Sequence, residues 1–77
     1  MSVQTANITT TIKETIRTLQ SDNGQATQDA VFNALRRNTK QPFDRVQERY
    51  ETLRKQGEIY SYPSGGVVVV RVTDDAL

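Results

Sequence analysis

The sequence predicts an α+β fold in which three helices are followed by a C-terminal two-stranded β-hairpin. Apolar residues recur at helical spacing in three separate segments, and each segment ends at residues that break helices. After the third segment, two stretches that favour strands flank the sequence Pro-Ser-Gly-Gly, which is typical of a tight turn. A chain of 77 residues forms one domain with a small core, and we expect that domain to span residues 8–72.

The first predicted helix follows residues 1–7, which we expect to be disordered because they are small and polar. The sequence is consistent with two starts for this helix. Asn7 can cap a helix that begins at the next residue, or Thr11 and Glu14 can form a capping box. Gly24 closes the cluster that ends the helix. The residues that recur on its apolar face are Ile8, Ile12, Ile16 and Leu19.

The second predicted helix begins after a short extended link, residues 25–26. Thr27 is the expected N-cap, and Asp29 in the first turn interacts favourably with the helix dipole. The helix is expected to end near Arg37. Its small apolar residues allow a neighbouring helix to approach closely. The predicted buried face consists of Ala30, Val31, Ala34 and Leu35.

The third predicted helix spans residues 42–56. Pro42 is expected at its first position, because proline disfavours helical geometry in the residue before it. Gly57 ends the helix. Residues 38–41 form the turn between the second and third helices, as in a helix-turn-helix. The predicted buried stripe consists of Phe43, Val46, Tyr50 and Leu53.

The predicted hairpin follows directly. Its first strand is residues 58–62, with Ile59 facing the core, and its tip is residues 63–66, where glycines are available for positive φ. Residues 67–72 are β-branched and form the second strand. Residues 73–77 are expected to be an acidic tail outside the domain. Three helices followed by this hairpin predict a winged helix-turn-helix, in which the hairpin is the wing.

The segment Leu53-Arg54-Lys55-Gln56-Gly57-Glu58-Ile59-Tyr60 resembles the end of the recognition helix and the first wing strand in two replication families. One is the C-terminal winged helix of minichromosome maintenance replicative helicases, and the other is that of the middle subunit of replication protein A. The resemblance implies a module that contacts DNA or docks onto a protein, without catalysis of its own. We therefore expect a role in DNA replication or transcription regulation. The matching positions are Leu53, Gly57, Glu58, Ile59 and Tyr60.

Positive charge is concentrated in and just before the third helix. Residues 36–55 contain seven basic and three acidic residues, a net charge of +4, whereas the rest of the chain carries −3. We expect this helix to enter the major groove of double-stranded DNA, with Arg45 at a guanine edge and Gln41 at an adenine edge. Asp44 and Glu48 on the same face favour the alternative of a solvated surface of mixed charge. The residues predicted to bind DNA are Arg36, Arg37, Lys40, Gln41, Arg45, Arg49, Thr52 and Lys55.

The wing favours a different partner, because its tip carries no charge. Two tyrosines share one strand face if Ile59 faces the core, and alternate valines of the second strand point away from the core. The tyrosines are expected to pack against the valines of the neighbouring strand, or to bind a protein, including a second copy of the chain. The residues predicted for this protein interface are Tyr60, Tyr62, Val67 and Val69.

Catalysis and metal binding are not expected, because the sequence contains neither cysteine nor histidine. The serines have no neighbouring base. We therefore predict a protein that is not an enzyme and that needs no cofactor or metal. The sequence has no apolar stretch of the roughly 20 residues that span a membrane, and its start lacks a signal-peptide pattern. The expectation is a cytoplasmic protein without a membrane partner.

Overall fold

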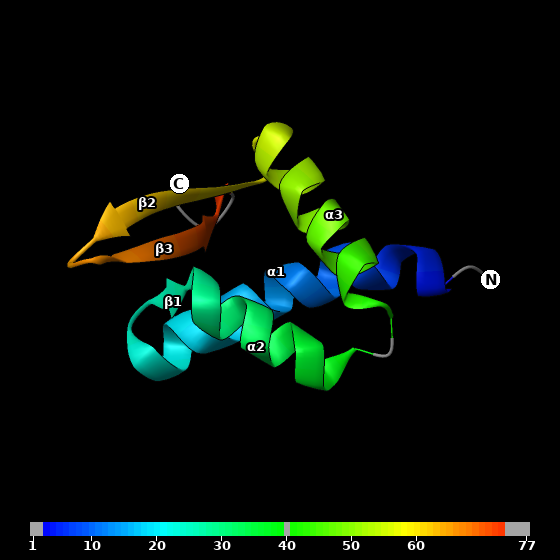
Figure 1. The fold of residues 1–77 in the computed structure, drawn as a ribbon, viewed down its shortest axis with the longest axis horizontal. Helices are drawn as coiled ribbons and strands as arrows, with labels where there is room; N and C mark the ends of the chain where they lie inside the picture. Colours follow the sequence, from blue (N-terminus) through cyan, green and yellow to red (C-terminus); the bar gives the residue numbers. More distant parts are fainter. Residues whose placement is uncertain (1–2, 40, 74–77) are drawn as a thin grey trace.

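The computed structural model of the chain describes residues 3–39 and 41–73. Three helices precede a small antiparallel sheet (Figure 1), which confirms the predicted α+β class with a C-terminal β-hairpin wing. The elements in chain order are α1 (Val3–Asn23), β1 (Ala26–Thr27), α2 (Gln28–Asn38), α3 (Phe43–Lys55), β2 (Ile59–Ser64) and β3 (Val67–Val72).

Helix α1 begins at Val3, earlier than either predicted start. The segment expected to be disordered therefore overlaps the first turns of this helix. The threonines at 9–11 have modest helix propensity, but a helix that is already nucleated extends at little cost per residue. The core interactions of Ile12 and Ile16, both fully buried, provide that nucleus. Helix propensity is a local property of the sequence, so it does not include the contribution of these core contacts.

The start of α2 follows the predicted pattern. Thr27 is the N-cap, and its Oγ1 accepts a hydrogen bond from the backbone N–H of Ala30 at 3.2 Å. Of the predicted extended link, Gln25 lies in a bend and Ala26 is extended, and Ala26 and Thr27 form the short strand β1, which pairs with β3. Thr27 therefore belongs to the sheet and caps a helix at the same time.

Helix α3 begins within one residue of its predicted start. Pro42 is its N-cap, and the Pro42 carbonyl accepts hydrogen bonds from the N–H groups of Arg45 and Val46. The helix ends at Lys55, and Gly57 follows with φ of 80°, in the left-handed region that favours glycine. Gly57 thus reverses the chain between α3 and the wing, as the sequence predicts.

The sheet has the strand order β1-β3-β2, with both pairings antiparallel. Strands β2 and β3 are joined by Gly65 and Gly66, whose φ values of 58° and 84° match a type I′ turn. The two-residue strand β1 lies on the other side of β3. The third strand, which the sequence analysis did not predict, converts a free hairpin into a sheet attached to the helices.

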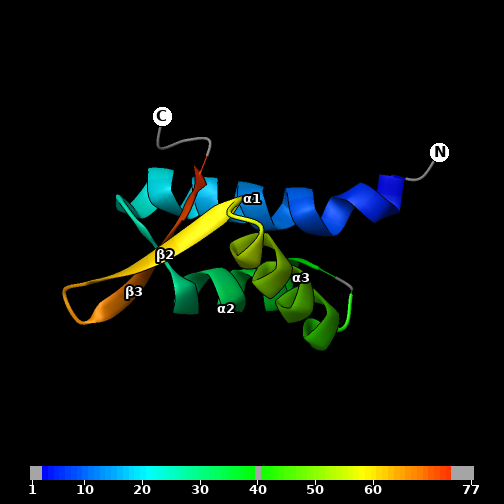
Figure 2. The ribbon, with the colours of Figure 1, turned by 90° about the horizontal axis from the view of Figure 1, so that it is seen from above.

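The core lies between the three helices and one face of the sheet. Figure 2 shows α1 and α2 running side by side, and Figure 1 shows α3 crossing α1. Tyr50 of α3 is fully buried at the centre of the core, and its hydroxyl donates to Oε1 of Gln28 at 3.3 Å. Burial raises the pKa of Tyr50 to about 12, although the nearby Arg54 acts in the opposite direction. At the surface, Lys13 Nζ lies 2.7 Å from Oε1 of Glu58, which links α1 to the start of the wing.

The end of β3 continues into the first residue of the predicted tail. The backbone N–H of Thr73 donates to the carbonyl of Glu58 at 3.0 Å, and its side chain donates to the carbonyl of Gly57. Thr73 is therefore part of the folded unit. Residues 74–77, the rest of the predicted acidic tail, lie outside the described residues.

Candidate nucleic-acid interface

The solvent side of α3 is divided into two strips of different charge. Asp44, Glu48 and Lys55 recur at helical spacing on the outermost strip, and all three are exposed. Arg45 and Arg49, one turn apart, occupy the neighbouring strip. This division follows from the periodicity of the helix, because residues four apart share a face and residues one apart do not.

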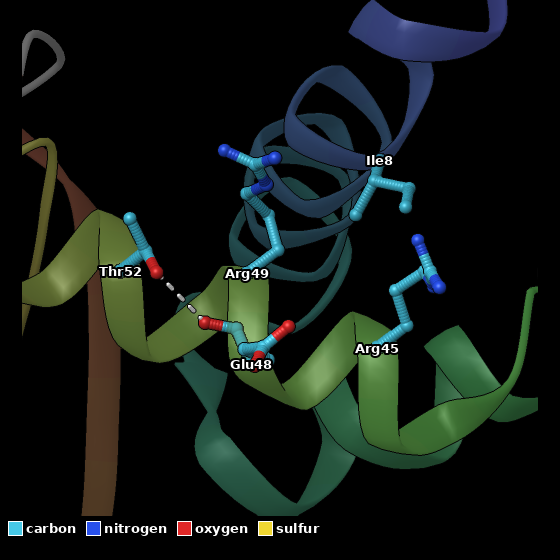
Figure 3. A pocket seen from close by; sticks show the side chains of 5 residues that line it. All are labelled: Ile8, Arg45, Glu48, Arg49 and Thr52. Atoms are coloured by element: carbon cyan, nitrogen blue, oxygen red, sulfur yellow. Dashed lines mark hydrogen bonds between the residues drawn. The ribbon is translucent and has the colours of Figure 1, made fainter.

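The strip with the two arginines borders an open cleft between α3 and the N-terminal half of α1 (Figure 3). The cleft has a volume of about 290 Å³. Figure 3 shows that the side chains of Arg45 and Arg49 both extend from α3 toward α1, where Ile8 forms an apolar wall. The residues that line it are Ile8, Arg45, Glu48, Arg49 and Thr52.

Neither Arg45 nor Arg49 forms an ion pair with any residue that the structure describes. Thr52 uses its hydroxyl within α3, donating to the carbonyl of Glu48 at 3.0 Å. Two guanidinium groups thus point into one cleft, which Glu48 also lines, and neither group has a salt-bridge partner among the described residues. Such an arrangement attracts an anion, because guanidinium groups bind phosphate or carboxylate oxygens through charge-assisted hydrogen bonds.

The arginines of α2 lie elsewhere. The guanidinium of Arg36 stacks over the ring of Phe43, 4.3 Å from its centroid, in a cation–π interaction. Phe43 in turn contacts Phe32 edge to face, with centroids 5.6 Å apart. Arg37 lines a groove between α1 and α2, together with Glu14. The structure therefore does not bring the arginines of α2 to the cleft.

The remaining residues predicted to bind DNA are spread along the turn and α3. Gln41 is exposed, and its backbone N–H donates to Oγ1 of Thr39 at 3.1 Å. Lys55 is exposed in the last turn of α3 and is not one of the residues that line the cleft. Lys40 lies outside the described residues. Of the predicted set, the cleft unites Arg45, Arg49 and Thr52, and it adds Ile8, which sequence reasoning assigned to the core alone.

The wing presents a different surface. Tyr60 and Tyr62 share a face, as predicted, and their rings stack with centroids 6.1 Å apart and planes inclined by 24°. The large apolar side chains that are exposed among the described residues all belong to the wing. They are Tyr62 (39% exposed), Val67 (42%) and Val68 (41%). Within the described residues, the large exposed apolar side chains thus lie in the outer half of the hairpin.

One predicted interface residue of the wing is not accessible. Val69 is buried, with 1% of its surface exposed, so it cannot contribute to an exposed interface. Val69 lies in the central strand between Thr27 of β1 and Tyr62 of β2. Tyr62 and the residues that connect α1 to β1 surround it, including Gly24. The prediction failed because strand alternation alone leaves this face open, whereas the end of α1 and the link that follows it lie against it.

No helix in the described part of the chain is long and apolar enough to cross a membrane. Comparison of the chain with protein-family models, with curated proteins and with solved structures found no match.

Proposed function

We propose that this protein binds double-stranded DNA through the cleft between α1 and α3, with Arg45 and Arg49 contacting the phosphate backbone. The observation that carries the proposal is the pair of guanidinium groups that point into one open cleft without salt-bridge partners among the described residues. Electrostatic contacts to phosphates supply most of the affinity of non-specific DNA binding. Two arginines on one rigid helix are a suitable minimal site for such contacts.

The direction of the Arg45 side chain favours phosphate over the base edge predicted from the sequence. It extends toward α1 beside Ile8, not away from the protein as a side chain that enters the major groove must (Figure 3). The outermost strip of α3 carries Asp44 instead, and Glu48 lies at the border between that strip and the cleft. These carboxylates would be repelled by phosphates if the helix lay deep in the groove. We therefore place the DNA backbone along the flank of α3 that faces α1.

The proposed cellular process rests on the local resemblance to two replication families, at the end of the recognition helix and the first wing strand. The resemblance covers Leu53 to Tyr60, and in this structure these residues form the last turn of α3, its glycine stop and the start of β2. A role in DNA replication or in transcription regulation is part of the proposal. The motif supports a winged-helix module and does not distinguish between these two processes.

A titration with random-sequence duplex DNA at several salt concentrations tests the proposal. The double variant Arg45→Gln/Arg49→Gln should bind more weakly than the parent at every salt concentration. Its plot of log affinity against log salt should be shallower by about 2, because two phosphate contacts are lost. The matched control, Arg37→Gln/Arg54→Gln, removes the same charge outside the cleft and should keep the parental slope. Absence of binding by the parent at low salt would refute DNA binding altogether.

A second function is favoured by the wing, whose tip is uncharged and whose exposed side chains are apolar. Tyr62 and Val67 share one face of the hairpin and form a surface suited to protein docking, while Val68 is exposed on the opposite face. A photo-crosslinking residue at position 62 should join the chain to a partner protein, whereas the same residue at the exposed position 47 of α3 should not. Equal crosslinking from both positions would argue against the wing as the docking surface.

A further inference from the structure

Strand β2 is at the edge of the sheet. The order β1-β3-β2 leaves one side of β2 paired with β3, and no described element pairs with its other side. An edge strand presents a row of backbone N–H and C=O groups that can pair with another chain. The identity of those groups follows from the register of the hairpin.

The register assigns the outward groups of β2 to alternate residues. Thr73 donates its N–H to the carbonyl of Glu58, so this opposed pair is a hydrogen-bonded one. Because hydrogen-bonded and non-hydrogen-bonded pairs alternate along an antiparallel ladder, Ile59, Ser61 and Pro63 direct their backbone groups away from β3. Pro63 has no N–H, which is the arrangement in which an edge strand tolerates proline.

The composition of β2 makes this edge unusual. Natural edge strands are commonly protected by charged residues, especially lysine, but residues 59–64 contain none. The only protective feature within the strand is Pro63, which removes one outward donor near the tip. Ile59 and Ser61 each keep a donor and an acceptor. The stacked rings of Tyr60 and Tyr62 lie on one face of the same strand and would flank any chain that paired with it.

We propose that a second copy of this chain pairs with β2, strand to strand and antiparallel, about a two-fold axis through Ser61. Each Ser61 N–H then donates to the Ser61 carbonyl of the other copy. Each Ile59 N–H donates to the carbonyl of Pro63 in the other copy, and only the carbonyl opposite the proline nitrogen lacks a donor. The three-stranded sheet continues across both molecules.

The side chains of β2 favour a second copy as the occupant of this edge. In the symmetric register, Tyr60 of one molecule lies opposite Tyr62 of the other, so that two stacked pairs meet on one face. The strand brings no charge to the contact, so two copies do not repel each other there. The contact involves few residues on each side, far fewer than a standard interface, so the dimer is weak and depends on protein concentration.

Two substitutions test the register in opposite directions. Ser61→Pro removes the central outward donor without removing a bond to β3, and it should weaken dimerisation at least tenfold. Pro63→Ala restores an outward donor that can meet the Ile59 carbonyl of the other copy. It should tighten the dimer roughly tenfold, because one hydrogen bond is added on each side of the two-fold axis. Sedimentation equilibrium over a range of protein concentrations measures both changes, and circular dichroism verifies that each variant is folded.

Amide hydrogen exchange supplies the second readout. In the parent, the amides of Ile59 and Ser61 should become more protected as protein concentration rises. Those of Tyr60 and Tyr62 already pair with β3 and serve as internal controls. A parent that stays monomeric at high concentration overturns the proposal, and so does a dimer that Pro63→Ala leaves unchanged. Protection of Ile59 and Ser61 by an added uncharged peptide, with the chain itself monomeric, would assign the edge to a different partner and overturn the second copy.

Discussion

The cleft between α1 and α3 and the outer half of the wing are the two exposed regions with distinctive chemistry, and they differ in how they use charge. The cleft gathers two arginines without salt-bridge partners among the described residues. The wing exposes Tyr62, Val67 and Val68 around an uncharged tip. An anion suits the first region and an apolar or backbone partner suits the second. One small domain therefore presents two surfaces that suit chemically different ligands.

The largest effect that separates these regions is expected inside the wing itself. Val69→Asp places a carboxylate in the buried part of the central strand and should lower the free energy of unfolding by at least about 4 kcal/mol. Val67→Asp, at an exposed position of the same strand, should cost less than about 1 kcal/mol. Urea denaturation of both variants measures the difference. Similar losses in the two variants would mean that the wing is not covered as the structure shows.

The core beneath both regions should show a dependence on alkaline pH. Tyr50 has a folded pKa of about 12, above the value of 10.0 expected when it is exposed. Its stabilising contribution is therefore complete below pH 10 and is lost as the pH rises toward 12, because the unfolded chain ionises first. Two pKa units correspond to about 3 kcal/mol. The variant Tyr50→Phe should lack this component when unfolding is measured across the same pH range, and an identical slope in both proteins would contradict the assignment.

A smaller effect is expected at the junction between the helices and the sheet. Thr27→Ala removes the N-cap hydrogen bond of α2 and should lower the free energy of unfolding by about 1 kcal/mol. Thr27→Ser keeps a capping oxygen and should preserve most of this stability. Thermal or urea unfolding distinguishes the two variants. Equal losses would show that the methyl group and the strand β1, not the cap, carry the contribution of Thr27.

The smallest effect concerns the wing tip and DNA. Ser64→Lys adds a positive charge to a tip that has none. If DNA lies along the flank of α3 that faces α1, the variant should bind duplex with nearly the parental affinity and salt dependence. A matched variant that adds the charge beside the cleft, Glu48→Lys, should bind more tightly because it removes a carboxylate from the cleft lining. A clear gain from Ser64→Lys would place the wing against the DNA.

The sequence was sufficient for features that depend on neighbours along the chain. The cap at Thr27, the stop at Gly57 and the positive φ of Gly65 and Gly66 are confirmed. Two bounds differ slightly: Pro42 caps α3, which begins at Phe43, and β2 extends to Ser64, so that the turn is shorter than the predicted tip. Each confirmed feature is set by local backbone geometry or by one short hydrogen bond. Residues that set helix ends and turns can therefore be predicted without any knowledge of the tertiary structure.

The features that were missed depend on contacts between distant segments. The pairing of Ala26 with Val70 and the burial of Val69 require knowledge of what lies across the core. The cleft was missed for the same reason, because it needs Ile8 beside α3. The arginines could be found from their charge. Their shared direction toward α1 could not, because the position of α1 is set by packing.

The distribution of the tyrosines gives the protein its own optical probes. The chain contains three tyrosines and no tryptophan, so its near-ultraviolet signals come mainly from these side chains. Tyr50 is enclosed in the core against Phe32, with ring centroids 4.8 Å apart, while Tyr60 and Tyr62 stack on the wing. Loss of the Tyr50 signal therefore reports global unfolding. A change in the Tyr60–Tyr62 pair alone reports an event at the wing, and single phenylalanine substitutions assign the two signals without an added label.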